Sequence, residues 1–246
     1  MDEDDFPMER NRPGYQDWYF FCYGTDYRQA LADFILLTGR APMPSKNVFG
    51  LIFSRWPAYD EQEAREIIAQ FEKEGIPLST LVLDMEWHKE GWAHWDWDEK
   101  MYDDPGAFFD WIHERGMEVT LNVHPLRIRE DDSHFEPFVE AVGGHERVAD
   151  AEYNKKPFRK IDIDICDKEQ ALPFMHICHD AFAEMGLDYW WVDGTRGRMN
   201  GVDDQLVGSK LYWESVASEE KRGMLLSRYG GLGTHRYGVF FTGDGI

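Results

Sequence analysis

The stretch LDYWWVDG, residues 187–194, places four large apolar side chains in a row before an aspartate and a glycine. A continuous apolar run of this kind is typical of a strand that is buried on both faces of a sheet. A carboxylate buried without a partner costs several kcal/mol or shifts its pKa. We therefore expect Asp193 to lie where a buried strand ends, either at the rim of the core or paired with another group.

Five further apolar runs occur along the chain, and helix-like segments separate most of them. The runs are residues 48–54, 79–87, 117–125, 223–231 and 237–245. The clearest helix-like segments are residues 60–75, with Asp60 as the cap and Gly75 as the stop, 105–116 and 168–186. Buried strands that alternate with helices predict an α/β fold with a parallel sheet covered by helices. Units of this size favour a (β/α)8 TIM barrel over an open doubly wound sheet.

Six strand candidates are two fewer than a closed barrel of this type needs, and the sixth runs to the end of the chain. We therefore expect a partial barrel over residues 48–246, with six of eight strand–helix units and an open edge. Residues 1–47 are predicted to be a linker or a remnant of a preceding β domain. Within them we expect a turn and strand over residues 10–24 and an amphipathic helix over residues 27–39.

Composition narrows the classes of partner. The chain has 246 residues, 47 acidic and 26 basic, and a formal net charge of −21. Such a surface repels phosphate backbones and anionic lipid, so we expect neither a nucleic-acid nor a membrane partner. The acidic start MDEDDF is unlike a signal peptide, and three cysteines form no even-numbered framework, which predicts a cytoplasmic location.

Polar or charged residues follow all six strand candidates. They are residues 54–56, 84–88, 122–124, Asp193, 227–228 and 242–244. Because parallel barrel strands end at one face, these residues predict a shared polar pocket. Carboxylates accept hydrogen bonds from hydroxyl groups and indole rings cover the apolar face of a sugar, so the expected ligand is a carbohydrate. Two facing carboxylates can cleave a glycosidic bond, and we choose Asp193 and Asp244 as that pair.

We expect no metal and no organic cofactor. His88, His94, His113 and His124 show no spacing typical of metal ligands, and lone histidines are more often hydrogen-bonded structural residues. A strand-end aspartate, in turn, often only caps the following helix, and Arg228 has the alternative of a plain salt bridge. The tryptophan-rich segment 91–98 fits loop packing and a sugar platform equally well.

Several motifs together resemble glycoside hydrolase family 31, the retaining α-glucosidases and α-xylosidases. Residues 17–50 are similar to the passage from that family's β-sandwich into its barrel. The motif LDMEWHKEGWAHWDWDEKMYDDP, residues 83–105, is similar to its second-strand motif. WWVDG, residues 190–194, resembles the strand that carries its nucleophile, and residues 227–244 resemble the segment that leads to its acid/base aspartate.

The resemblance implies a role for each matching residue. Asp193 would be the nucleophile and Asp244 the general acid/base. Asp84 and Arg228 would bind substrate hydroxyl groups, and Trp191 would line the same subsite. Glu86 and His88 are further candidates for substrate binding.

One segment departs from the family pattern. Many members carry an apolar residue, asparagine and glutamate after the nucleophile, whereas this chain has Gly194, Thr195, Arg196 and Gly197. The departure leaves the linkage preference open among α-glucosidase, α-xylosidase and α-transglucosylase. A truncated remnant or carbohydrate-binding module without turnover is the alternative from another class.

Overall fold

The computed structural model describes residues 6–7, 18–151, 158–194, 198–199, 202–231 and 233–243. Its centre is a six-stranded parallel sheet in which spatial order follows chain order. The strands are β1 (Leu51–Phe53), β2 (Leu78–Leu83), β3 (Glu118–Val123), β7 (Tyr189–Val192), β10 (Leu225–Ser227) and β11 (Val239–Phe240). All six expected strands are therefore present, and the expected incomplete parallel barrel is confirmed.

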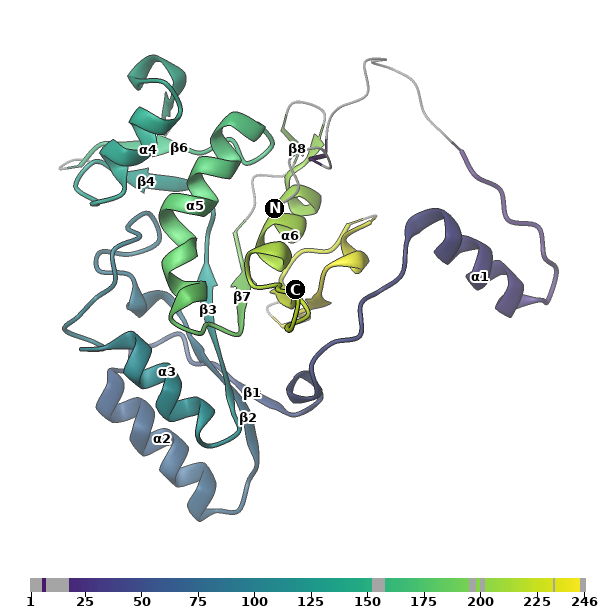
Figure 1. Cartoon of the computed structure of the whole chain (residues 1–246). Coiled ribbons are helices and arrows are strands. Elements are labelled where there is room, and N and C mark those ends of the chain that lie inside the picture. The colour runs from purple at the N-terminus through teal and green to yellow at the C-terminus, as the bar shows by residue number, and fades with distance from the viewer. Residues whose placement is uncertain are drawn as a thin grey trace.

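Helices cover one face of this sheet, as Figure 1 shows. They are α2 (Glu61–Lys73), α3 (Pro105–His113), α5 (Lys168–Glu184) and α6 (Asp204–Ser215). The first three were expected from the sequence, and α2 begins with a capping box between Asp60 and Glu63. The helix α6 was not expected, because it is buried on nearly all sides and its sequence shows no apolar stripe. Even Lys210 is buried, and its ammonium group pairs with Glu214.

Alternation along β7 distributes its two tryptophans between two cores. Trp190 is fully buried between the sheet and the helices, where Trp87, Phe182 and Tyr212 surround it. Trp191 points to the opposite, concave face, where its ring contacts Phe241. Successive strand side chains point to opposite faces, so both faces of this strand are apolar. The concave face carries an open groove of about 330 Å³ lined by Trp191, Val82 and Leu226 among others.

The connection between β3 and β7 contains a small subdomain that the apolar runs of the sequence did not predict. It has an antiparallel sheet in the order β4-β6-β5 and one short helix. The elements are β4 (Arg127–Arg129), α4 (Phe135–Ala141), β5 (Ala149–Asp150) and β6 (Lys160–Asp162). A second small hairpin pairs β8 (Arg198–Met199) with β9 (Val202–Asp203). The 3₁₀ helices are η2 (Lys46–Phe49), η3 (Met85–Trp87), η4 (His145–Arg147) and η5 (Thr234–Arg236).

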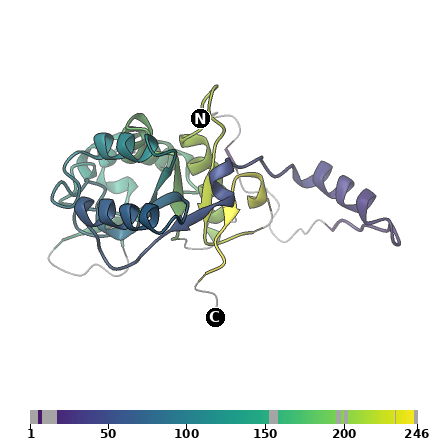
Figure 2. The same cartoon turned by 90° about the horizontal axis from the view of Figure 1, so that it is seen from below.

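The N-terminal part forms the expected helix α1 (Tyr27–Thr38) but not all of the expected strand. Residues 18–24, the described end of that predicted strand, form no strand with any described residue. Helix α1 lies beside the sheet in Figure 1 and projects away from it in Figure 2. Its Phe34 ring stacks on His235 of η5, and none of its own residues is buried within the described part of the chain. Among the described residues, no helix is both long and apolar enough to span a membrane.

Candidate active site

Four neighbouring strands bring polar side chains together at one edge of the sheet, where β3, β7 and β10 end level and β2 ends two residues earlier in the register. Asp84 follows β2, Asn122 and His124 lie at the end of β3, Asp193 follows β7 and Arg228 follows β10. The register aligns Val192 of β7 with Val123 and with Ser227. The ladder also continues past the strand ends, since the Asp193 amide donates to the Val123 carbonyl at 3.0 Å and the Arg228 amide to the Val192 carbonyl at 3.1 Å.

Asp193 is the centre of this group. It is 9% exposed and forms an ion pair with the guanidinium of Arg228, whose Nη2 donates to Oδ2 at 3.2 Å. Asn122 Nδ2 donates to the same oxygen at 3.3 Å, and Nε2 of His124 lies 3.6 Å from it. Burial by itself would raise the pKa of the Asp193 carboxyl, but His124, Asn122 and the charge of Arg228 outweigh it and hold the pKa below its usual value. The carboxylate is therefore ionised and fixed in place.

Asp84 is a second carboxyl at the same edge and titrates in the opposite direction. Burial and then the negative charge of Asp193 raise the pKa of Asp84 to about 6, although a hydrogen bond from Ser54 opposes the rise. The Ser54 hydroxyl donates to Asp84 Oδ2 at 3.3 Å. Near neutral pH this carboxyl can therefore accept hydrogen bonds from substrate hydroxyls, and in mildly acidic solution it can donate one as well.

An aromatic ring closes the site on the side of β3. The indole of Trp92 stacks on the imidazole of His124, with 4.0 Å between ring centroids and 24° between ring planes. Asn122 and His124 belong to the strand ends that the sequence predicted to share a polar pocket, and Trp92 belongs to the segment left open between loop packing and a sugar platform. None of the three was given an individual role. Their positions after the third apolar run and within the tryptophan-rich loop were visible, but their distance from Asp193 depends on strand register.

Close packing explains why glycine occupies position 194, directly after Asp193. A Cβ atom at Gly194 would lie 2.9 Å from the Cβ and Cγ atoms of His124 and 3.0 Å from its Cα atom. Contacts below 3.0 Å force a displacement, and here the contact includes backbone of the neighbouring strand end. Glycine at this position therefore lets His124 lie against the end of β7, next to Asp193.

The remaining predicted binding residues occupy different surroundings. Glu86 is half-buried in η3, next to Asp84, and lines a small space with Arg55 and Trp56. His88 is 2% exposed, stacks on Trp87 and bonds the His94 carbonyl at 2.6 Å, and its burial lowers its pKa to about 3. Trp191 lines the concave groove together with Ser54, whose hydroxyl donates to Asp84. Their roles in binding stay predictions.

Two parts of the predicted site lie outside the described residues. They are Asp244, the expected acid/base, and residues 195–197, the segment that departs from the family pattern. The described chain reaches Gly243, three residues beyond β11. In chain order, Asp244 comes after β11 and Arg228 comes after β10. These two strands pair with each other.

Comparisons with known proteins agree with this architecture. Residues 41–245 match the model of the glycosyl hydrolases family 31 TIM-barrel domain. The chain is 28% identical over 108 residues to an alpha-xylosidase of Saccharolobus solfataricus, covering 44% of this chain and 15% of that protein. It is 23% identical over 262 residues to alpha-glucosidase 2 of Bacillus thermoamyloliquefaciens, covering 93% of this chain and 32% of that protein.

A solved structure of the same family has the same fold. The Flavobacterium johnsoniae GH31 dextranase complexed with glucose superposes with a TM-score of 0.73 at 22% identity, covering 90% of this chain and 30% of that one. The chain thus spans less than a third of the length of these relatives. The chain forms a six-stranded parallel half-barrel with polar residues at one edge, and a family model matches most of its length. This chain therefore belongs to glycoside hydrolase family 31, whose members are glycosidases.

Proposed function

We propose that this chain supplies most of the catalytic site of a retaining α-glycoside hydrolase that acts on α-glucosides or α-linked oligosaccharides. The observation that carries the proposal is the environment of Asp193. Its carboxylate is ionised, nearly buried and oriented by Arg228 and Asn122 at the strand edge. A nucleophile for covalent catalysis must be ionised and rigidly placed, and this carboxylate meets both conditions.

The proposed reaction has two displacements. In the first, an Asp193 oxygen attacks the anomeric carbon while Asp244 gives a proton to the leaving glycosidic oxygen, so that a covalent glycosyl ester forms and the aglycone departs. In the second, Asp244 takes a proton from water, and the water oxygen attacks the same carbon and releases Asp193. The anomeric carbon inverts once in each displacement, and two inversions retain its configuration. This mechanism predicts roughly 5–5.5 Å between the two carboxyl groups.

Substrate recognition is assigned to the groups around the nucleophile. Asp84 would bind hydroxyl groups of the sugar that Asp193 attacks, and Arg228 would hold both the substrate and Asp193. Trp92, stacked on His124, offers an indole for the apolar side of the ring. The relatives named as alpha-glucosidase, alpha-xylosidase and dextranase support an α-linked neutral sugar as the substrate class.

The test assays the whole gene product on aryl α-glucoside, α-xyloside and α-galactosaminide. Asp193→Ala is expected to lower kcat on the accepted substrate by at least about 10³-fold. Added azide should then restore turnover of an activated aryl glycoside and yield the β-glycosyl azide, because azide attacks the face that the nucleophile has vacated. Asp180→Ala, which changes an exposed aspartate on α5, is the matched control and should retain activity.

A second candidate is a carbohydrate-binding module without turnover, which the open concave groove favours. Sugar binding and aglycone release, measured on Asp193→Ala and on the unchanged protein, distinguish the two candidates. A binding module retains its affinity for sugar in Asp193→Ala and releases no aglycone in either form. The hydrolase proposal fails if the unchanged protein releases no product from any of the three substrates, or if Asp193→Ala is as active as Asp180→Ala.

A further inference from the structure

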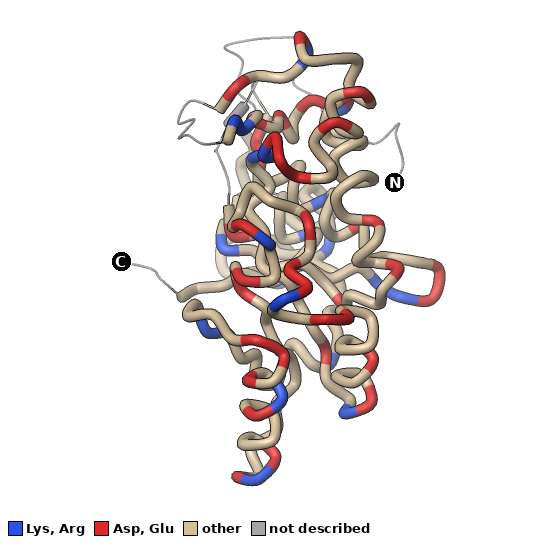
Figure 3. Tube along the Cα trace, turned by 90° about the vertical axis from the view of Figure 1, so that its left-hand side faces the viewer, with Lys and Arg blue, Asp and Glu red and all other residues tan. Residues whose placement is uncertain are grey.

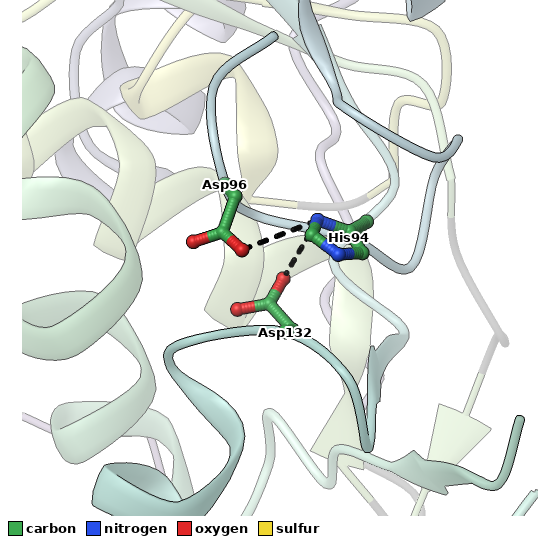
Figure 4. Close-up of side chains that lie close together, drawn as sticks. All are labelled: His94, Asp96 and Asp132. Carbon is green, nitrogen blue, oxygen red and sulfur yellow. Dashed lines mark ion pairs between the residues drawn. The ribbon is translucent and has the colours of Figure 1, made fainter.

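Three side chains from two separate segments converge beside the active-site loop. His94 and Asp96 lie in the loop that follows η3, and Asp132 lies in the turn between β4 and α4. One potential ligand atom from each of the three lies within 4.8 Å of the others. Figure 4 shows the imidazole of His94 facing both carboxylates. None of these residues has a part in the proposed reaction.

The ring nitrogen of His94 is the informative atom. His94 is 1% exposed, and its Nδ1 atom is buried with no hydrogen-bond partner in the described part of the chain. That nitrogen lies 3.4 Å from Asp132 Oδ2 and 3.7 Å from Asp96 Oδ2. Buried polar atoms without a partner are rare, since each loses the hydrogen bonds it made to water. An atom placed between this nitrogen and the two oxygens would give the nitrogen the partner that it lacks.

The two carboxylates are held by outer partners, as metal ligands usually are. The side chain of Asp132 is fully buried and accepts hydrogen bonds from the amide of Trp95 and from both the amide and Nδ1 of His134, the last two at 2.8 and 2.7 Å. Asp96 accepts from the hydroxyl and the amide of Ser133. The oxygen of each carboxylate nearest His94 Nδ1 is Oδ2, which accepts from the Trp95 amide in Asp132 and from the Ser133 amide in Asp96 and still has a lone pair for a metal ion.

The spacing fits one small ion. Nitrogen and oxygen ligands lie roughly 2.0–2.2 Å from tetrahedral zinc, which separates neighbouring ligand atoms by roughly 3.3–3.6 Å. The 3.4 Å distance from His94 Nδ1 to Asp132 lies within that range, and the 3.7 Å distance to Asp96 exceeds it by about 0.1 Å. Calcium and magnesium prefer six or more oxygen ligands, whereas imidazole favours zinc and its neighbours. We propose that His94 Nδ1, Asp96 and Asp132 bind one zinc ion, with water as the fourth ligand.

Such an ion would position the sugar-binding face of the site without entering the reaction. It would tie the loop of His94 and Asp96 to the turn of Asp132. That loop also carries Trp92, which stacks on His124, and the His94 carbonyl bonds the ring of His88. The sequence showed no such site because its ligands are separated by 36 residues and become neighbours only through the fold.

The test is direct binding of zinc to the untagged full chain after treatment with a chelator. Titration calorimetry is expected to show one zinc ion per chain. His94→Gln and Asp96→Asn should each raise the dissociation constant for zinc by roughly 100-fold. This is the upper end of the loss of affinity seen when a metal site loses a supporting partner. Asp96 lies in a partly exposed loop, so its variant should fold even if His94→Gln does not. His176→Gln is the matched control, because His176 forms an exposed pair with Asp180.

Cobalt substitution supplies a second readout. Cobalt bound to three protein ligands and water in a tetrahedral site gives intense visible absorption bands, which zinc should displace and which Asp96→Asn should abolish. The proposal is overturned if the unchanged chain takes up no zinc, or if both ligand variants bind it as tightly as His176→Gln does. In that case the cluster is a structural contact between the His94 ring and the two carboxylates.

Discussion

Two aspartates at the same sheet edge have carboxyl pKa values shifted in opposite directions, because their partners differ. Asp193 faces one guanidinium, one amide and one imidazole, whereas Asp84 faces one hydroxyl group and the charge of Asp193. Each environment therefore moves a carboxyl pKa in its own direction. A pair of titratable groups with pKa values shifted in opposite directions is typical of active sites.

The raised pKa of Asp84 predicts a gain in stability when its charge is removed. Its pKa is about 6 in the folded chain, above the ordinary value of 3.8, so the folded state binds the proton more tightly than the unfolded state. The contribution of Asp84 to the free energy of unfolding should therefore fall as pH rises from about 4 to 6. Asp84→Asn lacks this loss and should be more stable above pH 6 by up to about 3 kcal/mol.

Urea unfolding at pH 4 and pH 7 measures this difference. Asp103→Asn, at an exposed position, is the control and should show no pH-dependent gain. An Asp84→Asn chain whose stability relative to the unchanged chain is the same at both pH values would contradict the assigned environment.

The ion pair with Arg228 predicts a shift in the pH profile of catalysis. Arg228→Leu removes the positive charge that helps to keep the pKa of Asp193 low. The acidic limb of kcat/KM, which reports the ionisation of the free enzyme's nucleophile, should move to higher pH. Arg236→Leu, which removes an exposed arginine bonded to the Gly233 carbonyl, should leave the limb in place. A uniform fall in kcat/KM with an unshifted limb would assign Arg228 to substrate binding alone.

At the scale of elements, the site depends on how closely the ends of β3 and β7 approach. Hydrogen bonding continues from Val123 to Asp193 beyond the last paired residues, and Gly194 leaves room for His124. The ladder register therefore sets the distance between the nucleophile and its partners on β3. A side chain at Gly194 would separate them.

Gly194→Ala is expected to lower stability and activity together. The new methyl group would overlap His124, including its Cα atom, so the strand ends must shift at a cost of roughly 1–3 kcal/mol. Thermal unfolding and kcat/KM check the two effects. Gly208→Ala is the matched control, because its added Cβ would make an ordinary contact of 3.7 Å with Ile165 and would favour helix α6. Equal behaviour of the two variants would show that the strand ends are not in close contact.

At the scale of the whole molecule, negative charge dominates. Figure 3 shows acidic segments spread over the side of the molecule that it presents, with fewer basic ones among them. The formal net charge is −21, and like charges at this density repel one another and destabilise the compact state. Salt should therefore raise the unfolding temperature at neutral pH by screening this repulsion.

The measurement compares thermal unfolding at roughly 10 mM and 0.5 M sodium chloride, which differ several-fold in Debye length. The expected change is a rise of a few degrees. A neutral osmolyte at matched osmolality is the control, since it screens no charge. An unfolding temperature that falls with salt would mean that attractive ion pairs, such as Arg127 with Asp162, outweigh the repulsion.

The sequence by itself determined the order of the six strands, three of the four helices on the sheet and the strand-end position of Asp193. These features depend on local patterns: apolar runs, caps such as Asp60 and stopping glycines. Local patterns failed for α6, because a helix buried on nearly all sides has no apolar stripe. They also failed for the small sheet between β3 and β7, whose strands have only two or three residues each.

Only the tertiary structure decided which side chains meet. Asn122 and His124 become partners of Asp193 through parallel register, and Trp190 and Trp191 enter different cores through alternation along one strand. His94 meets Asp132 because two loops fold against each other. The pKa values of Asp84 and Asp193 differ for the same reason. Burial and neighbouring charge depend on distances through space, and separation along the chain does not determine those distances.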